Sequence, residues 1–351
     1  MYREFYGLNE KPFSLTPDPQ YLYFSEGHRT AMESLLYGIH QKEGFMVLTG
    51  DIGTGKTTLC RALLEKLDKQ VKTAVIFNSF LNEAELLKSI LQDLGSPSKG
   101  RTKKELVDDL NKFLIQQLLE GRKVVLIIDE AQNLSIPVLE QTRMLSNLET
   151  EKEKMLQIIL LGQLELDRKL RSSKLQQLNQ RVSIRHRLLP LTRKEMGSYI
   201  LQRLTVAGAH GNITFSRSAL REIYKFSKGI PRVINLLCDR ALLAGFVGQT
   251  HHIDRKIVRK AKGSLLGEET GRPFSNFGTW MRRSIPVHFS LIAIFLSLIA
   301  GTTLSVLLNQ SVRSFAWGSI QGIYSKVSDG PEQTPSRIAV QGTPRDLSQL
   351  P

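Results

Sequence analysis

Short apolar runs alternate with amphipathic stretches through the first half of this chain. Between the runs, apolar residues recur at the three- and four-residue spacing of helices that cover a sheet. Strands that alternate with helices are typical of an α/β fold, in which a mostly parallel sheet is buried on both faces. We therefore predict a three-layer α/β domain over residues 44–190. Its expected strands are Phe45–Thr49, Thr73–Phe77, Lys123–Ile128, Met155–Gly162 and Ser183–Leu188.

After the last of these strands the pattern becomes wholly helical, which predicts a small helical domain over residues 191–265. Pro231 fits the first position of one helix, where its missing N–H costs nothing. Residues 1–43 form a lead-in that we expect to pack on the folded part of the chain that follows it. The prolines of Asn9–Pro19 favour an extended path, and a helix is expected over Glu26–Ile39. The helices expected in the small domain are Arg193–Val206, Arg217–Ser227, Pro231–Phe246 and Asp254–Ala261.

Ile285–Leu308 is a run of 24 residues without Asp, Glu, Lys or Arg. At 1.5 Å per residue it is long enough to cross a hydrocarbon core of about 30 Å. A buried helix of a soluble core is the alternative, but such helices are usually shorter and keep a polar stripe. Because Arg282 and Arg283 precede the run, the positive-inside rule puts the preceding domains in the cytoplasm. We therefore predict a single transmembrane helix, a linker before it over 266–284, and a short disordered tail outside over 309–351.

The net charge and the cysteines restrict the possible partners and sites only slightly. A net charge of +15 favours nucleic acid, anionic lipid or nucleotide as partners without choosing among them. Cys60 and Cys238 lie far apart in apolar helical patterns, so we expect reduced core residues and no disulfide. His251-His252 has no Cys or carboxylate at metal-ligand spacing beside it, which favours a loop over a metal site.

A glycine-rich segment between the first strand and the following helix carries the strongest chemical signal. It matches G-x-x-x-x-G-K-[ST] and has the strand–loop–helix context that this motif requires. Gly53 and Gly55 allow backbone N–H groups to converge on phosphate oxygens at a helix N-terminus. Lys56 can reach the β- and γ-phosphates, and the Thr57 hydroxyl can bind Mg²⁺. The predicted nucleotide-binding residues are Gly50, Asp51, Ile52, Gly53, Thr54, Gly55, Lys56, Thr57 and Thr58.

A second signal is the apolar strand that ends in Asp129-Glu130, which has the form of a Walker B strand. Asp129 would face the Mg²⁺ held by Thr57, and Glu130 is placed to polarise the attacking water. A guanine-selective N-K-x-D motif is missing, because Asn111-Lys112 is followed by no Asp and lies in a helical pattern. The predicted cofactors are therefore ATP and Mg²⁺.

Three further features suit a hydrolysis switch: a glutamine, a cluster of arginines and a single arginine at a helix start. Gln163 places an amide at the end of an apolar strand, where it can contact the γ-phosphate or water; an ordinary strand-end polar residue is the alternative. Arg181, Arg185 and Arg187 form a cluster that is either a solvated basic face or the source of an arginine finger for a neighbouring subunit. Arg232 begins a helix, where a cation is unfavourable unless it has an anionic partner such as phosphate.

Together these residues resemble an AAA+ ATPase, and more narrowly the general secretion pathway protein A (GspA/ExeA) family. The resemblance covers about residues 1–265 and continues into a single transmembrane helix. The segments that carry it are Phe5-Tyr6-Gly7-Leu8, Pro12-Phe13, Pro17-Asp18-Pro19, Gly162-Gln163-Leu164-Glu165-Leu166, Leu178-Asn179-Gln180-Arg181-Val182 and Gly229-Ile230-Pro231-Arg232-Val233-Ile234-Asn235-Leu236-Leu237-Cys238.

The resemblance implies roles for several residues. Gln163 takes the sensor 1 role and Arg232 the sensor 2 role, while Arg181 is the leading finger candidate and Arg185 the next. A finger from a neighbour implies ring-like homo-oligomers. The chain departs from the family at Leu164, where Pro is usual. Only the predicted 43-residue tail follows the membrane run, so we expect no periplasmic peptidoglycan-binding domain of the kind that some members carry.

Three functions are then open. The first is an ATPase anchored in the bacterial inner membrane, with its ATPase domain cytoplasmic and its tail periplasmic. It would drive a cell-envelope machine for secretion, pilus assembly or polysaccharide export. The second is a DNA-associated ATPase of the transposition-regulator or origin-recognition type, which the basic charge would suit. The third is a scaffold that binds ATP without hydrolysing it. The membrane run favours the first function, because such DNA regulators are normally soluble.

Overall fold

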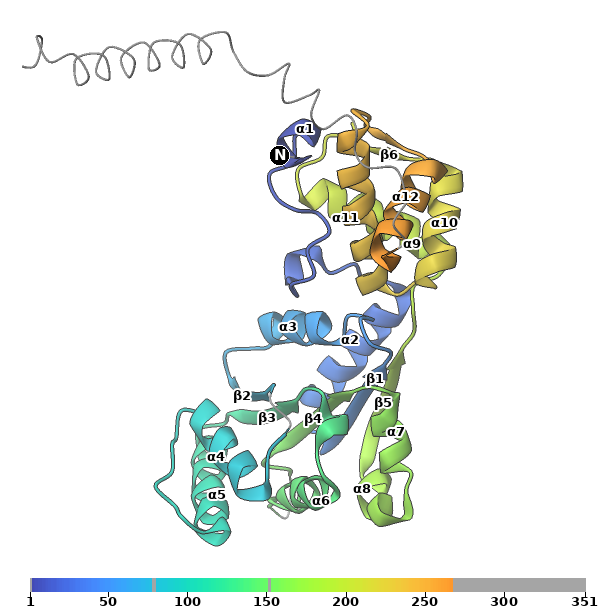
Figure 1. Cartoon of the computed structure of the whole chain (residues 1–351). Helices are drawn as coiled ribbons and strands as arrows, with labels where there is room; N and C mark the ends of the chain where they lie inside the picture. Colours follow the sequence, from blue (N-terminus) through green and yellow to red (C-terminus); the bar gives the residue numbers. More distant parts are fainter. Residues whose placement is uncertain (1, 78–79, 151–152, 268–351) are drawn as a thin grey trace, which may run out of the picture. The chain divides into compact units, whose positions relative to one another are not determined.

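A computed structural model describes residues 2–77, 80–150 and 153–267 of the chain (Figure 1). Within these residues, each helix is too short or too polar to span a bilayer. The predicted transmembrane run at Ile285–Leu308 and the tail after it lie outside the described residues, as does nearly all of the predicted linker.

Five strands form a parallel sheet in the order β2-β3-β4-β1-β5, which confirms the predicted α/β architecture. β1 and β4 are buried along their whole length, and this is why they stand out as continuous apolar runs. β5 is an edge strand. A register shift opposite Phe45 and Met46 lets Val182 pack in the core on one face of the sheet and Ile184 in the core on the other. The strands are β1 (Phe45–Gly50), β2 (Val71–Ile76), β3 (Lys123–Ile128), β4 (Gln157–Gly162) and β5 (Val182–Leu188).

Helices cover both faces of the sheet, as expected for three layers (Figure 1). Met46 and Leu48 of β1 pack with α2 and α3 in one core, whereas Phe45 and Val47 pack in the core that contains α4, α5 and α6. The first layer consists of α2 (Glu26–His40) and α3 (Lys56–Lys66). The second consists of α4 (Glu83–Asp93), α5 (Lys103–Leu119), η2 (Ala131–Asn133), α6 (Ile136–Leu145), α7 (Leu164–Leu170), η3 (Ser173–Leu175) and α8 (Gln176–Gln180).

The helical domain forms around a core of its own. Tyr6, Leu8 and Phe13 of the lead-in belong to this core, whereas Leu22 and α2 belong to the core on the sheet. The lead-in is thus divided between the two cores. The domain contains α9 (Arg193–Val206), α10 (Arg217–Ser227), α11 (Pro231–Val247) and α12 (Arg255–Leu266), and the lead-in contains α1 (Tyr2–Tyr6) and η1 (Pro19–Tyr21).

One expectation about the helical domain was wrong. It also contains β6 (Thr214–Phe215) and β7 (His252–Ile253), two short strands that pair in parallel. His252 therefore lies in a strand rather than in a loop. The neighbouring His251 ring packs against Phe5, and its Nε2 lies 3.2 Å from the Phe5 carbonyl oxygen. Sequence patterns miss strands of two residues, because an alternating pattern needs about four residues to be recognised.

Cys60 and Cys238 are both free and buried, as predicted. Burial raises the pKa of the Cys60 thiol to about 12 and also raises that of Cys238, since a thiolate would lose its hydration there. Both residues therefore act as core side chains.

Arg203 of α9 attaches the lead-in to the helical domain. Its side chain is buried, and its guanidinium donates hydrogen bonds to the carbonyl oxygens of Pro12, at 2.5 Å, and Ser14, at 3.3 Å. The same group lies 4.5 Å from the centre of the Tyr21 ring, which adds a cation–π contact. Carbonyl oxygens and aromatic rings thus replace the water that the buried cation gives up.

Replacing Arg203 should therefore destabilise the fold. We expect Arg203→Met to lower the free energy of unfolding by about 2–4 kcal/mol, because two lead-in carbonyls lose a charged partner. Arg193→Met removes an exposed cation from the same helix and should change stability by less than about 0.5 kcal/mol. Urea unfolding measures both variants, and equal midpoints for the two would contradict this role of Arg203.

Candidate nucleotide-binding site

The predicted phosphate loop follows β1 at the carboxyl edge of the sheet and leads directly into α3. Gly53 and Gly55 have φ angles of +79° and +99°, a left-handed conformation that glycine adopts at little cost. Gly55 is the N-cap residue of α3, so the first N–H groups of that helix face the loop. This is the backbone arrangement that binds phosphate. The side chain of Ile52 is exposed, and Thr58 lies in the first turn of α3.

Lys56 holds the loop together from inside. Its amine donates to the carbonyl oxygens of Gly50 at 3.0 Å and Asp51 at 3.1 Å, and the Thr54 hydroxyl also donates to Asp51 O at 2.9 Å. Burial lowers the pKa of the Lys56 amine, while the carboxylates of Glu130 and Asp129 act in the opposite direction. The Lys56 amine is thus placed at the loop, where it can reach a phosphate bound there.

The two predicted metal ligands are in direct contact. The Thr57 hydroxyl donates to Asp129 Oδ2 at 2.7 Å, and Asp129 Oδ1 accepts the backbone N–H of Glu130 at 2.8 Å. Asp129 is buried at the end of β3. Hydroxyl and carboxylate oxygens are the ligands that Mg²⁺ prefers, and nucleotide-bound Mg²⁺ needs only one or two of them from the protein. The donor set therefore fits a magnesium ion.

Glu130 and Gln163 also lie together. Gln163 Nε2 donates to Glu130 Oε2 at 3.2 Å, although one residue follows β3 and the other follows β4. Glu130 has a φ angle of +50°, which is uncommon for a residue other than glycine and is often found at functional sites. The parallel sheet brings the two side chains to one edge, because β3 and β4 are neighbours.

A residue that the sequence did not indicate, Gln132, joins this pair. Its Nε2 donates to Glu130 Oε2 at 2.5 Å, and its Oε1 accepts the backbone N–H of Gln163 at 3.0 Å. The only available signal was its position two residues after Glu130. His28 of α2 was also missed: its Nε2 lies 3.0 Å from the carbonyl oxygen of Thr54 in the phosphate loop.

Arg232 stands where the helical domain meets the phosphate loop. Its backbone N–H donates to Gly53 O at 3.2 Å, and its side chain is exposed. A Cβ atom at Gly53 would lie 2.5 Å from the Cβ of Arg232, so only glycine permits this approach. The predicted sensor position and the loop are therefore in contact in one chain.

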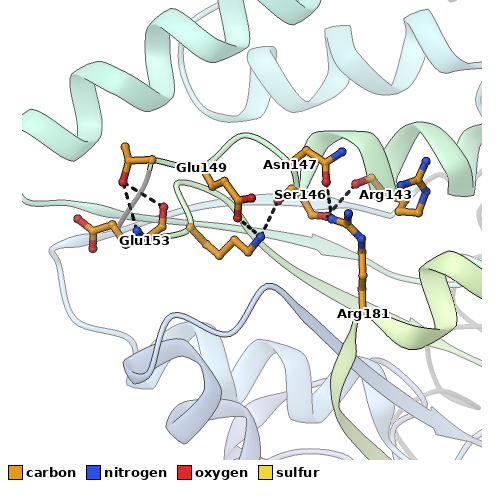
Figure 2. Close-up of polar contacts among 8 residues, drawn as sticks. Arg143, Ser146, Asn147, Glu149, Glu153 and Arg181 are labelled. Atoms are coloured by element: carbon orange, nitrogen blue, oxygen red, sulfur yellow. Dashed lines mark hydrogen bonds and ion pairs between the residues drawn. The ribbon is translucent and has the colours of Figure 1, made fainter.

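Arg181 lies away from the phosphate loop of its own chain. In Figure 2 its side chain reaches the end of α6, where Nη1 is 3.2 Å from Ser146 Oγ and also contacts Asn147. The next residue, Val182, is paired with Phe45 at the start of β1, whereas the loop follows the last residue of β1. At about 3.3 Å per residue, five residues of β1 separate the two by about 16 Å.

The other two arginines of the cluster lie further along β5. Arg185 pairs with Asp167 and donates to Asn179 Oδ1 at 2.6 Å. Arg187 is exposed and lies opposite Thr49 in the sheet. Both Arg181 and Arg185 are thus bound by polar groups of their own chain.

Comparison with known proteins agrees with this geometry. Residues 39–170 match the AAA domain family. The chain is 45% identical over 281 residues to the general secretion pathway protein A of Aeromonas hydrophila. The matched region covers 80% of this chain and 50% of that protein. The chain thus spans about half the length of this relative. The expected resemblance to general secretion pathway protein A is confirmed.

Solved structures share the fold at low sequence identity. Cdc6p from Pyrobaculum aerophilum has a TM-score of 0.56 at 20% identity, covering 72% of this chain and 70% of that chain. The Aeropyrum pernix ORC2 protein has a TM-score of 0.55 at 18% identity, and the match covers 91% of this chain and 84% of that chain. The fold is therefore a P-loop AAA-type α/β fold, and the AAA domain supports nucleotide binding and ATPase activity.

The contacts of Gln132 lead to a prediction about hydrolysis. Gln132→Met removes the amide that holds both Glu130 and Gln163, so we expect the rate of ATP hydrolysis to fall about 10- to 100-fold. The Kd for ATP should change less than about threefold, because within the described residues the Gln132 side chain bonds to Glu130 and Gln163 and not to the phosphate loop. Gln116→Met, which removes an exposed amide of α5, is the matched control. Wild-type turnover by Gln132→Met would contradict this role.

Proposed function

We propose that this chain, as an AAA ATPase similar to general secretion pathway protein A, hydrolyses Mg-ATP while anchored in the bacterial inner membrane. Its work would be to assemble or operate a cell-envelope machine for secretion, pilus assembly or polysaccharide export. The observation that carries the chemistry is the meeting of Lys56, the Thr57–Asp129 pair and the Glu130–Gln163 pair at one edge of the sheet. The 45% identity to the Aeromonas protein supports the envelope role.

Each side chain has a defined task in this proposal. The Lys56 amine would leave the loop carbonyls and donate to phosphate oxygens, and Glu130 would orient and polarise the attacking water. Gln163 would hold the Glu130 carboxylate and sense the γ-phosphate. Arg232 would contact the nucleotide from the helical domain. Magnesium bound by Thr57 and Asp129 would neutralise charge on the β- and γ-phosphates.

Arg181 would act on the nucleotide of a neighbouring subunit. It lies at the opposite end of β1 from its own phosphate loop, and its guanidinium is held at a fixed place by the end of α6. A finger in that position needs a homo-oligomer, and we propose a ring.

The anchoring part of the proposal rests on the sequence. Ile285–Leu308 would cross the membrane once, with residues 266–284 as the linker and residues 309–351 in the periplasm. Residues 1–43, 44–190 and 191–265 would remain in the cytoplasm as the lead-in, the sheet domain and the helical domain.

Mixing two inactive variants tests the finger. Lys56→Ala should abolish nucleotide binding, and Arg181→Ala should lower turnover by about 10³-fold or more. A mixture of the two should recover part of the wild-type activity, because the intact Arg181 of one subunit then serves the intact loop of the other. The assay measures the phosphate released by ATP hydrolysis, and each variant alone is the control. A pull-down between differently tagged subunits shows whether mixed oligomers form. If they form and activity does not recover, Arg181 is excluded as the finger.

A second candidate function is a DNA-associated ATPase of the transposition-regulator or origin-recognition type. A basic surface on α10 and α12, two helices that pack together, favours it. The acid between them, Glu222, accepts a hydrogen bond from Arg255 Nε at 3.0 Å and lies 3.8 Å from Arg259 Nε. The exposed cations of this basic surface are Arg217, Arg221, Lys225, Arg255, Lys256 and Arg259.

Fractionation of cells that produce the tagged full chain separates the two candidates. We expect recovery in the membrane fraction, resistance to alkaline carbonate and release by detergent. The double variant Leu291→Arg, Leu296→Arg adds two charges to the apolar run, at about 2.5–3.5 kcal/mol each, and should move to the soluble fraction. The opposite result would be a wild-type chain that is wholly soluble and binds duplex DNA with steep salt dependence. That result would contradict the envelope function and favour the second candidate.

A further inference from the structure

His28 joins helix α2 to the phosphate loop through a fully engaged ring. The side chain is 3% exposed, its Nδ1 lies 2.6 Å from Ser25 Oγ, and its Nε2 lies 3.0 Å from the carbonyl oxygen of Thr54. A carbonyl oxygen only accepts, so Nε2 carries the proton, and Nδ1 accepts the hydroxyl proton of Ser25. Burial lowers the pKa of His28, which agrees with this neutral form of the ring.

The contact fixes one peptide unit of the loop. A trans peptide is planar, and its C=O and N–H point in opposite directions. When Thr54 O points to His28, the N–H of Gly55 must therefore point to the other side, away from α2. Within the described residues, this N–H donates to no protein atom. It is thus available to a ligand bound in the loop.

We propose that His28 is a positioning residue of the nucleotide site: it holds the Thr54 carbonyl and so turns the Gly55 N–H toward a bound phosphate. This inference rests on the proposed function, because it assumes that the loop binds a nucleotide. His28 itself does not touch the phosphate. Its effect passes through the Thr54–Gly55 peptide.

The space around the ring agrees with this task. A Cβ atom at Gly55 would lie 3.1 Å from His28 Nε2, a tight contact that would require the imidazole to shift. Gly55 also has a φ angle of +99°, a conformation in which side chains are strained. The close contact between the His28 ring and the loop therefore favours glycine at position 55.

The first turn of α2 is held from the helical domain as well. Glu195 of α9 accepts the backbone N–H of Glu26 at 3.2 Å, and Ser25 caps the helix by accepting the N–H of His28 at 3.3 Å. Glu195 in turn forms a capping box with Thr192 at the start of α9. The position of His28 thus depends on two contacts. The imidazole ring contacts the phosphate loop, and the first turn of its helix contacts the helical domain.

Two substitutions of similar size separate positioning from packing. His28→Gln can place its Nε2 amide near the original Nε2 and keep a donor for Thr54 O, whereas His28→Leu keeps bulk and has no donor. The full chain in detergent is titrated with a fluorescent ATP analogue, and the unfolding temperature is measured without nucleotide. We expect the Kd of His28→Leu to rise about 10- to 100-fold and that of His28→Gln to stay within about threefold of wild type. Both variants should unfold at similar temperatures without nucleotide.

The possible results are distinct. Equal Kd values for the two variants, whether at the wild-type level or raised together, would overturn the positioning role, because the donor would then make no difference. Lys56→Ala serves as the control for loss of nucleotide binding. A wild-type chain that binds no ATP would overturn the proposed function together with this inference, whereas equal variants alongside a binding wild type would overturn the inference alone.

Discussion

A phosphate loop must leave its N–H groups free for a ligand, and its carbonyl groups then need donors from elsewhere. The rest of this structure supplies those donors from three places. Lys56 of α3 holds the carbonyls of Gly50 and Asp51, His28 of α2 is the partner of Thr54 O, and the backbone of Arg232 in α11 holds Gly53 O. The loop is thus ordered by its own helix, by the preceding helix and by the helical domain.

This arrangement explains why the site sits where the two cores meet. The carboxyl edge of the sheet carries Asp129 and Glu130 on β3 and Gln163 on β4, and the start of α11 reaches the same edge. A ligand held by the loop would therefore contact groups that belong to both domains. Nucleotide sites in open α/β sheets lie at this edge, because the helix N-termini and strand ends meet there.

The sequence predicted most of the regular structure, for identifiable physical reasons. Buried parallel strands such as β3 appear as uninterrupted apolar runs, and the start of α11 is marked by Pro231. The motif residues were found because their spacing is fixed by the ligand. Their pairings, such as Thr57 with Asp129, followed from the parallel order of the strands.

What the sequence did not reveal depends on contacts between distant segments. Gln132 lies in the short 3-10 helix η2 and His28 in an ordinary amphipathic helix, and nothing local distinguishes them from other polar residues. Their importance comes from partners at Gln163 and Thr54, 31 and 26 residues away. The division of the lead-in between two cores was missed for the same reason, since apolar residues on its two halves look alike in sequence.

That division has a mechanical consequence. The chain passes between the cores twice: Tyr21 belongs to the helical domain and Leu22 to the sheet, while Leu188 belongs to the sheet and Leu191 to the helical domain. A rotation about the line through these two crossings would leave both connections in place, whereas other movements would have to bend or stretch the connecting residues. The two crossings therefore favour movement of the helical domain about one axis, which the covalent chain defines.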